Sequence, residues 1–455
     1  MTHNRTIWLS ILALLIVSRA NADEKPTWKA GLAKAVITPK VPMWLAGYGG
    51  RDRPSEGTLH DIWIKALALE DAKGHRVVLL TSDLCGMPKW MYDSICASLK
   101  KTDGLEREQI RITNSHNHCA PAVRGDLEDY YPLDDVQRKR VYDYSDWLER
   151  EIIRTIRESL GNMRAATVSA GEGACTFAVN RRNNKEADIP EMRKRGETPK
   201  GPVDHSVPVL VVRGTKDELL AIVFGYACHN TVLSFYQWCG DYAGFAQIAL
   251  EKNYPGAMAM FVDGCGGDQN PLPRRTVELA EKYGNQLAAG VTQVVDHKMQ
   301  ALGPKLRSAF EFVDLPFEKN PTRLELNAHL KDGSPVRVRW AKRMLKQLDD
   351  GVPFAKSHPY AVQAWDLDGQ LWISLGGEVL VDYAHRYRKE FGARTWVTSY
   401  SADLTAYIPS ERNWREGGYE VGYLHEYMLP ADRWTRDVED RISGSVSRVV
   451  AKIKP

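Results

Sequence analysis

Residues 219–229 read Leu-Leu-Ala-Ile-Val-Phe-Gly-Tyr-Ala-Cys-His, and they give the clearest indication of the fold class. The apolar run is typical of a buried strand, and a histidine follows at its carboxyl end. Sheets of α/β proteins place their ligands at that end of a strand. His229 is therefore a candidate nitrogen ligand of a metal site, the third beside the two histidines of a motif described below. A histidine in such a position is also commonly a hydrogen-bonded loop residue.

Other segments extend the same pattern along the chain. Short β-branched runs at 77–81 and 209–212 predict further strands. Apolar residues recur at helical spacing over 142–160, 276–302, 379–391 and 431–453. Residues 181–204 are polar and contain three prolines, which predicts a long surface loop, and 319–353 form a charged insertion with helical character. Strands interleaved with helices predict an α/β fold.

Composition excludes several classes of protein. The chain has 455 residues, 43% hydrophobic and 26% charged, which is the profile of a folded enzyme and not of a disordered chain, a collagen or a coiled coil. Lys and Arg number 61 against 58 Asp and Glu, a net charge of +3, and no basic run is present. We expect no nucleic-acid partner.

The first 22 residues have the pattern of an export signal. A basic start with His3 and Arg5 precedes an apolar stretch over 7–17, and Ala20-Asn21-Ala22 matches a signal-peptidase site. The apolar stretch is shorter than the roughly 20 residues that span a bilayer. We therefore expect residues 1–22 to be cleaved and the mature protein to be secreted or periplasmic.

Seven cysteines are present, an odd number without a CxxC metal or redox motif. Export permits disulfides. Cys119, Cys228 and Cys265 each lie beside a motif described below, so we expect them near one another, and we expect buried free thiols.

The sharpest motif is Thr-Asn-Ser-His-Asn-His-Cys-Ala-Pro at 113–121, directly after a predicted strand at 110–112. Residues i and i+2 of an extended segment point to the same side, so His116 and His118 can face one cavity. Imidazole is the commonest zinc ligand at neutral pH. The alternative is a pair of structural histidines.

A glycine-rich segment, Phe-Val-Asp-Gly-Cys-Gly-Gly-Asp-Gln-Asn-Pro at 261–271, predicts a site loop or a tight turn. A phosphate loop is disfavoured because the GxxxxGK[ST] order is absent. Downstream, Ile-Ser-Leu-Gly-Gly-Glu at 373–378 predicts a strand leading into a helix, where Glu378 could serve as a helix cap. Tyr407 and Tyr419, among turn residues, would by themselves be interpreted as packing residues.

Taken in order, these motifs resemble the neutral, non-lysosomal ceramidases. The resemblance runs collinearly over 31–419 and rests on the following matches: 31–39, Gly47-Tyr48, 59–66, 81–84, 116–121, Asn180-Arg181, His229, Gly267-Asp268, Gly377-Glu378, Tyr407 and Tyr419. It implies a mixed-sheet α/β catalytic domain, a single large domain over 23–455.

The resemblance also implies a zinc site and its chemistry. The zinc ligands would be His116, His229, Glu378 and Tyr407, with Zn²⁺ activating water to cleave an N-acyl amide. Among the remaining catalytic residues, Arg181 would contact substrate, and His118 and Tyr419 would donate hydrogen bonds to the oxyanion.

Two departures from the family pattern change the expected chemistry. Asn270 precedes Pro271 where the ceramidases have a serine, so we expect Asn270 to position substrate or water and not to form an acyl intermediate. We also expect a member without the family's C-terminal β-sandwich. The substrate would then be a small N-acyl amide or a lipid, and membrane contact, through a loop at 42–45, would be possible but not required.

Two other functions remain open from the sequence. A TIM-barrel amidohydrolase also uses an HxH motif at a strand end, although several strands precede His116 here. An exported binding domain that kept the fold and lost the chemistry is suggested by Asn270.

Overall fold

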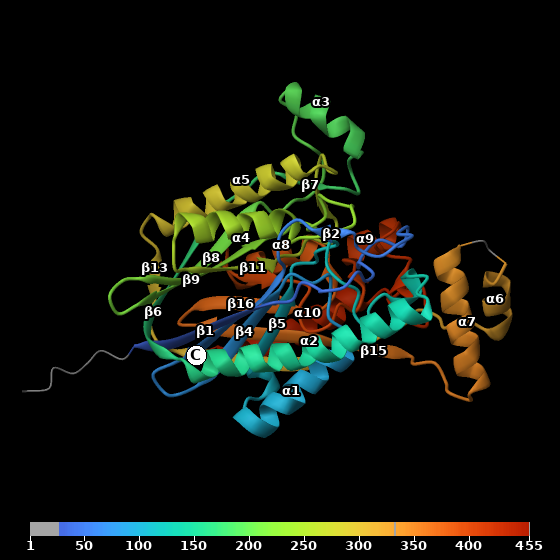
Figure 1. Ribbon diagram of the computed structural model, residues 1–455, viewed down its shortest axis with the longest axis horizontal. Helices are drawn as coiled ribbons and strands as arrows, with labels where there is room; N and C mark the ends of the chain where they lie inside the picture. Colours follow the sequence, from blue (N-terminus) through green and yellow to red (C-terminus); the bar gives the residue numbers. More distant parts are fainter. Residues whose placement is uncertain (1–26, 332–333, 455) are drawn as a thin grey trace, which may run out of the picture.

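A computed structural model describes residues 27–331 and 334–454 of the chain (Figure 1). The expected export signal at 1–22 lies outside the described residues. No described helix is long and apolar enough to cross a membrane.

Within these residues, the larger sheet has nine strands in the order β11-β9-β8-β6-β1-β3-β4-β5, with β13 added beside β6. The strands are β1 (Trp28–Val36), β3 (Trp63–Glu70), β4 (Arg76–Ser82), β5 (Ile110–Asn114), β6 (Arg164–Ala174), β8 (Ser206–Gly214), β9 (Leu219–Tyr226), β11 (Met258–Asp263) and β13 (Gln300–Leu302). β9 pairs with β11, and β4 with β5, in parallel, while the other neighbours are antiparallel. The sheet is therefore mixed.

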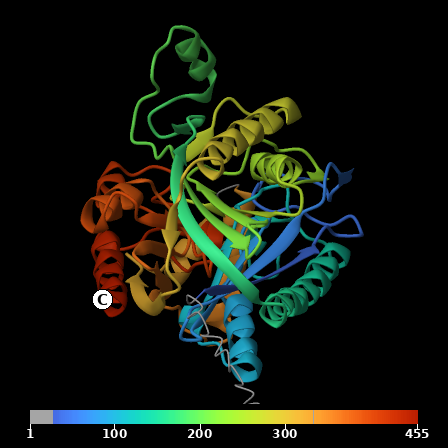
Figure 2. The ribbon, with the colours of Figure 1, turned by 90° about the vertical axis from the view of Figure 1, so that its left-hand side faces the viewer.

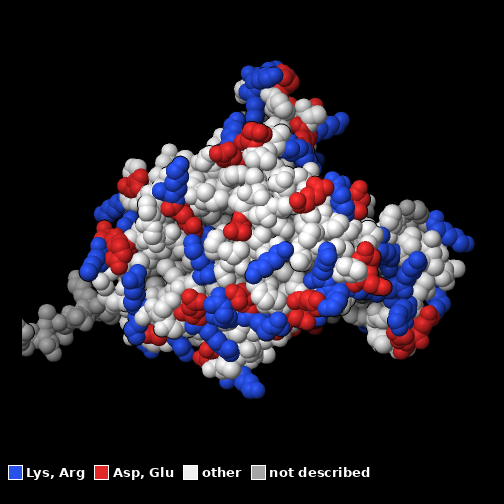
Figure 3. All heavy atoms as spheres, viewed as in Figure 1, with Lys and Arg blue, Asp and Glu red and all other residues white. Residues whose placement is uncertain are grey.

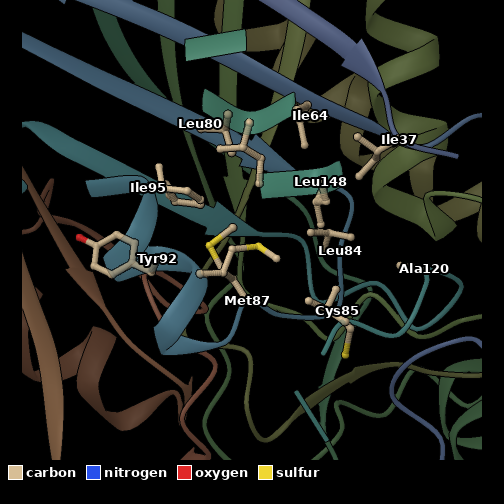
Figure 4. Close-up of a cluster of buried hydrophobic side chains, with 14 of the residues drawn as sticks. Ile37, Ile64, Leu80, Leu84, Cys85, Met87, Tyr92, Ile95, Ala120 and Leu148 are labelled. Atoms are coloured by element: carbon tan, nitrogen blue, oxygen red, sulfur yellow. The ribbon is translucent and has the colours of Figure 1, made fainter. Parts of the chain in front are cut away.

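Helices α2 (Asp135–Gly161), α4 (Asp241–Asn253) and α5 (Val277–Val295) cover one face of this sheet, and α1 (Lys89–Asp103) packs beside α2. In α2, Val141, Leu148 and Ile152 recur at helical spacing and are buried against the sheet. Figure 4 shows part of this core, where Cys85 lies at the edge of the cluster.

The opposite face packs on a second sheet of four strands, β14-β15-β16-β18. These strands are β14 (Leu306–Pro316), β15 (Ser357–Leu367), β16 (Gln370–Leu375) and β18 (Trp396–Thr398). Trp365, Trp372 and Trp396 fill the interface, and the rings of Trp372 and Trp396 stack with centroids 4.1 Å apart. Aromatic rings bury large apolar areas, so they hold the two sheets together.

Helices α8 (Asp382–Phe391) and α10 (Val438–Ile453) cover the outer face of the second sheet. Figure 2 shows the strands lying between α10 on one side and α2, α4 and α5 on the other. The layers run helix, sheet, sheet, helix. The expected mixed-sheet α/β fold is confirmed, and the TIM-barrel alternative is wrong because the strands form two stacked sheets and not a closed barrel.

Short elements connect these layers. Paired two- or three-residue strands are β2 (Gly57–Thr58) with β10 (Gln237–Trp238), β7 (Ala178–Asn180) with β12 (Gln269–Pro271), and β17 (Glu378–Val379) with β19 (Tyr407–Ile408). Single-turn helices are η1 (Arg107–Gln109), η2 (Glu128–Tyr130), η3 (Glu186–Asp188) and η4 (Leu424–Tyr427), and α9 spans Glu411–Glu416. Two of the strand pairs, β7 with β12 and β17 with β19, lie at the site described below.

The strands predicted at 77–81 and 209–212 are confirmed in β4 and β8, and helix α2 contains the predicted segment 142–160. The helix expected over 276–302 ends at Val295, because the chain turns at 296–299 and adds β13 to the sheet edge. The terminal helix expected over 431–453 begins only at Val438. The polar loop at 181–204 contains α3 (Ile189–Lys194), and the charged insertion forms α6 (Arg323–His329) and α7 (Pro335–Asp349), both projecting from the body in Figure 1.

The distribution of surface charge and the burial of Trp44 are relevant to possible nucleic-acid and membrane partners. Acidic and basic side chains are interspersed over the face seen in Figure 3. The loop at 42–45 was considered as a place for optional membrane contact, but Trp44 is only 4% exposed and packs in the core with Met43 and Leu45. A buried indole cannot insert into a bilayer, so Trp44 does not supply such a contact.

All seven cysteines are buried free thiols, as expected. Cys119 and Cys228 share one core cluster, whereas Cys265 lies in another.

Candidate metal centre

Three buried side chains from separate strands converge on one point. His116 follows β5, His229 follows β9, and Glu378 begins β17. Nε2 of His116 lies 3.1 Å, and Nε2 of His229 3.2 Å, from the same oxygen, Oε2 of Glu378. One ligand atom from each residue lies within 4.8 Å of the others, and none of the three residues is more than 2% exposed. Glu378 is thus not a helix cap, because it lies in a strand and α8 begins only at Asp382.

Backbone carbonyl groups hold the Nδ1 atoms of both imidazoles. Nδ1 of His116 lies 3.0 Å from the carbonyl oxygen of Cys85, and Nδ1 of His229 lies 2.7 Å from that of Gly266. A carbonyl oxygen only accepts, so each Nδ1 donates a proton to it, and Nε2 is the nitrogen of each ring that can bind a metal. Burial and the nearby Arg181 lower the pKa of His229 to about 4, which keeps this ring neutral.

Glu378 completes a set that fits a cation. Tyr427 donates a hydrogen bond to Oε1 of Glu378, while the buried Oε2 has no hydrogen-bond donor among the described residues. The Nε2 lone pair of the neutral His229 faces this carboxylate oxygen, which is costly unless a cation lies between them. Two histidines and one carboxylate are a donor set that zinc accepts.

His118 and Tyr407 lie beside this triad. Nε2 of His118 is 3.1 Å from Nε2 of His116, and the hydroxyl of Tyr407 is 3.2 Å from Nε2 of His229. Burial raises the pKa of Tyr407 well above its ordinary value although Arg181 opposes the rise, so the phenol is neutral unless a cation reaches its oxygen. Either side chain could complete the coordination of a metal.

The turn at Gly47 fixes the His118 ring. A Cβ on Gly47 would lie 2.3 Å from that ring, and the glycine has a φ of 87°. The ring of the next residue, Tyr48, packs edge-on against His118 with centroids 4.5 Å apart. Only glycine allows both the backbone angle and the close approach.

The glycine-rich segment supports two of the three ligands. Gly266 accepts the hydrogen bond from His229, and a Cβ on Gly267 would lie 2.6 Å from the carbonyl oxygen of Glu378. The amide of Gly267 donates to Val379 in β17. The segment is thus a support loop beneath the candidate centre, which resolves the two interpretations that its sequence left open.

Arg181 links the centre to the protein around it. Its Nη2 donates to the Tyr407 hydroxyl at 2.9 Å, its Nη1 lies 3.3 Å from Nε2 of His229, and its Nε donates to Glu420 at 2.9 Å. The guanidinium is planar and fixes three partners at once. Arg181 therefore orients Tyr407 and His229 relative to each other.

A cavity of about 720 Å³ opens beside the centre. Its wall includes Arg181, Tyr48, Asn270 and Tyr419. Asn270 is 5% exposed and its Oδ1 has no hydrogen-bond partner in the described part of the chain. Tyr419 is 43% exposed, and its hydroxyl donates to Glu426 at 3.2 Å. The structure thus brings all eight residues predicted from the sequence to one region, with Tyr419 at the rim.

Sequence reasoning missed several residues of this region. Tyr427 and Glu420 contact Glu378 and Arg181, and Tyr400 stacks on His116 with ring centroids 4.5 Å apart. Glu420 directly follows Tyr419, and this neighbourhood in the sequence was the only indication that Glu420 lies near the site. Tyr400 lies in a bend and Tyr427 ends the single-turn helix η4, and no spacing in the sequence marks either residue.

Comparisons with known proteins show the family to which the chain is similar. The family described as neutral/alkaline non-lysosomal ceramidase, N-terminal, matches residues 28–271. Neutral ceramidases of Drosophila melanogaster and Drosophila pseudoobscura pseudoobscura are 28% and 27% identical over 116 residues, 25% of this chain and 16% of each relative. The matched segment is thus a small part of those proteins.

Two solved structures share the fold. The crystal structure of neutral ceramidase from Pseudomonas aeruginosa matches 94% of this chain and 75% of its own, with a TM-score of 0.71 and 17% identity. A structure described as ceramidase complexed with C2 gives a TM-score of 0.70, with the same coverage and identity. Because the family match extends over more than half of its residues, the chain belongs to the neutral/alkaline non-lysosomal ceramidase family.

Proposed function

We propose that this protein is an exported, zinc-dependent hydrolase that cleaves an N-acyl amide. One observation carries the proposal: the Nε2 atoms of His116 and His229 face the same buried oxygen of Glu378, and this oxygen has no hydrogen-bond donor among the described residues. Family membership supports amide hydrolysis as the reaction. Export rests on the sequence of residues 1–22 alone.

In this proposal His116, His229 and Glu378 hold the metal, and Tyr407 joins them. Zinc in such a site supplies Lewis acidity, which activates water and polarises an amide carbonyl. The chain excludes bulk solvent from the ligands, because His116, His229, Glu378 and Tyr407 are all at least 95% buried. A low local dielectric strengthens every electrostatic contact that the site makes with substrate.

The remaining residues bind and orient the amide. His118 and Tyr419 donate hydrogen bonds to the carbonyl oxygen as negative charge develops on it. Arg181 keeps Tyr407 in place through its hydrogen bond to the hydroxyl. Asn270 offers an amide group to substrate or to the attacking water from the cavity wall. An asparagine is not a nucleophile, so the reaction proceeds by direct attack of water.

The experiment is metal analysis of the purified mature protein together with hydrolysis of a panel of N-acyl amides that includes short-chain ceramides and N-acyl amino acids. We expect about one zinc per chain and release of free fatty acid. Glu378→Gln should lose both, whereas Glu281→Gln, on the exposed face of α5, should keep both. A folded wild-type protein without zinc or hydrolysis would leave a binding domain as the function, which is the alternative that Asn270 favours.

A further inference from the structure

We propose that the natural substrate is an amide that carries a carboxylate, and that Arg275 binds this carboxylate at the mouth of the cavity. The inference rests on the proposed hydrolase function and narrows its substrate class. Arg275 belongs to none of the motifs that identified the site, and it follows the support loop by a few residues.

Arg275 is an arginine with most of its hydrogen-bonding capacity unused. It lines the 720 Å³ cavity and is exposed there. Its Nη1 donates to the Tyr48 hydroxyl at 3.2 Å, and no carboxylate of the described residues forms an ion pair with it. A guanidinium has five N–H donors arranged for bidentate binding of a carboxylate. The side chain is therefore free to bind an anion.

The other arginines of the cavity wall are already neutralised. Each forms ion pairs with glutamates: Arg181 with Glu420, Arg182 with Glu416 and Glu420, and Arg274 with Glu186. These pairs balance one another in charge. Arg275 thus leaves the wall with an uncompensated positive charge, and this charge faces the space that substrate would occupy.

A second arginine increases this positive potential. Arg51 is 4% exposed and donates to the backbone carbonyls of Ala46 and Phe235. Its guanidinium carbon lies 4.8 Å from the ring centre of Tyr48, and that of Arg275 lies 5.6 Å from the same ring. Tyr48 in turn packs against His118. Two guanidinium groups without carboxylate partners among the described residues therefore adjoin the candidate centre through one tyrosine, which favours an anionic ligand.

Asn270 gives an independent indication that the cavity holds a polar ligand. Its side chain is 5% exposed, lines the same cavity, and has an Oδ1 atom without a partner in the described chain. A buried acceptor left unpaired is costly. An amide N–H of the substrate would satisfy it. Arg275 and Asn270 together then select an amide with a nearby anion, whereas a neutral ceramide leaves Arg275 without a partner.

The carboxylate could belong to either half of the substrate, and the experiment separates these cases. We would measure kcat/KM of the zinc-loaded wild type and of Arg275→Gln with four compounds. These are N-dodecanoylglycine, its neutral analogue N-dodecanoylglycinamide, the N-propyl monoamide of dodecanedioic acid, and a short-chain ceramide. The first compound places the carboxylate on the amine half and the third on the acyl half. Arg150→Gln on α2 is the matched control, because it removes the same exposed charge outside the cavity.

We expect Arg275→Gln to lower kcat/KM for the preferred carboxylate substrate by about 10- to 100-fold and for the neutral analogue by less than about 2-fold, since one charge-assisted contact is lost. Arg150→Gln should change neither value. Preference for the first or the third compound identifies the half that bears the carboxylate. Thermal unfolding of Arg275→Gln should match the wild type.

Two other results would contradict either the anion site or the proposed hydrolase function. Hydrolysis of ceramide or of the glycinamide at least as fast as of both carboxylates, with equal effects of Arg275→Gln on all, would overturn the anion site and leave the hydrolase standing. Absence of both zinc and hydrolysis with every compound would instead refute the proposed function, and this inference with it.

Discussion

Tyr427 donates its hydroxyl proton to Oε1 of Glu378, and Oε2 of the same carboxylate faces His116 and His229. The two oxygens therefore have separate tasks, because one is fixed by the protein and the other points at the imidazoles. Tyr427 lies in η4, and the N–H groups of Arg343 and Trp340 in α7 donate to the carbonyl oxygens of Met428 and Leu429 just beyond it. The helical insertion thus supports the orientation of a candidate metal ligand.

Tyr427→Phe should weaken zinc binding by about 10- to 100-fold, since outer hydrogen bonds that orient ligands typically contribute that much to metal affinity. Competition with a chromogenic chelator measures the affinity. Tyr254→Phe is the matched control, because its hydroxyl bonds to Asp296 outside the centre. Equal affinities of Tyr427→Phe and wild type would show that Glu378 needs no such support.

His229→Ala should abolish stoichiometric zinc and activity, because the centre loses one of three convergent donors. His297→Ala, in the exposed turn after α5, should retain about one zinc per chain. Inductively coupled plasma mass spectrometry of both variants provides the measurement. Full zinc and activity in His229→Ala would refute the assigned ligands.

The fold class could be predicted from the sequence because periodicity reports burial. The run at 219–226 is buried on both faces as β9, and α2 carries one apolar stripe. The ends of the helices could be predicted less well from the sequence. Apolar spacing continued past α5 into β13, and helical spacing began at Val379, in β17, before α8 started. In both cases the pairing with a distant strand, which local spacing does not encode, determined the structure.

The site could be assembled only through the order of its motifs. His116 and His118 were predicted to share a side because of strand geometry, yet both follow β5, and His116 has a φ of 53°. Their Nε2 atoms meet through a turn and not through strand alternation. Tyr427 and Arg275 were missed because each acts through a tertiary contact, to Glu378 and to Tyr48.

Tyr419→Phe tests the proposed oxyanion contact. Loss of such a donor typically lowers kcat by about 100- to 1000-fold. The same change should leave zinc content unaltered, because the Tyr419 ring touches Tyr407 only edge-on, with centroids 5.4 Å apart. Tyr423→Phe, whose ring packs on Tyr419, serves as the control for disturbing the rim. A higher KM with an unchanged kcat would instead assign Tyr419 to substrate binding.

Asp241 should make stability depend on pH. It is fully buried, accepts backbone N–H bonds from Val232, Leu233 and Tyr242, and burial raises its pKa from 3.8 to about 6. Because the pKa of Asp241 is higher in the folded than in the unfolded state, its contribution to the free energy of unfolding is complete below pH 3.8 and is lost as the pH rises through about 6. The shift corresponds to about 3 kcal/mol.

The comparison is urea unfolding of the wild type and Asp241→Asn at several pH values between 4 and 7, both in chelator. Asparagine does not titrate, so the advantage of the wild type should shrink by about 2 kcal/mol across this range. A constant difference between the two proteins would show that Asp241 has an ordinary pKa in the folded state.

Asn270 stands where the resemblance to the ceramidases implies a serine, and the proposed direct attack of water predicts that no acyl group is ever attached to Asn270. Asn270→Ala should lower kcat/KM only about 10-fold or less, because it removes one positioning hydrogen bond and no nucleophile. Acid quenching during turnover, followed by peptide mapping by mass spectrometry, should find residues 264–272 unmodified in the wild type. Asn270→Ser provides the informative contrast, since it introduces a hydroxyl at the same cavity wall and could form an ester. An acyl adduct on that segment of the wild type would overturn the direct-water route, whereas an adduct confined to Asn270→Ser would show that the asparagine itself keeps the pathway closed.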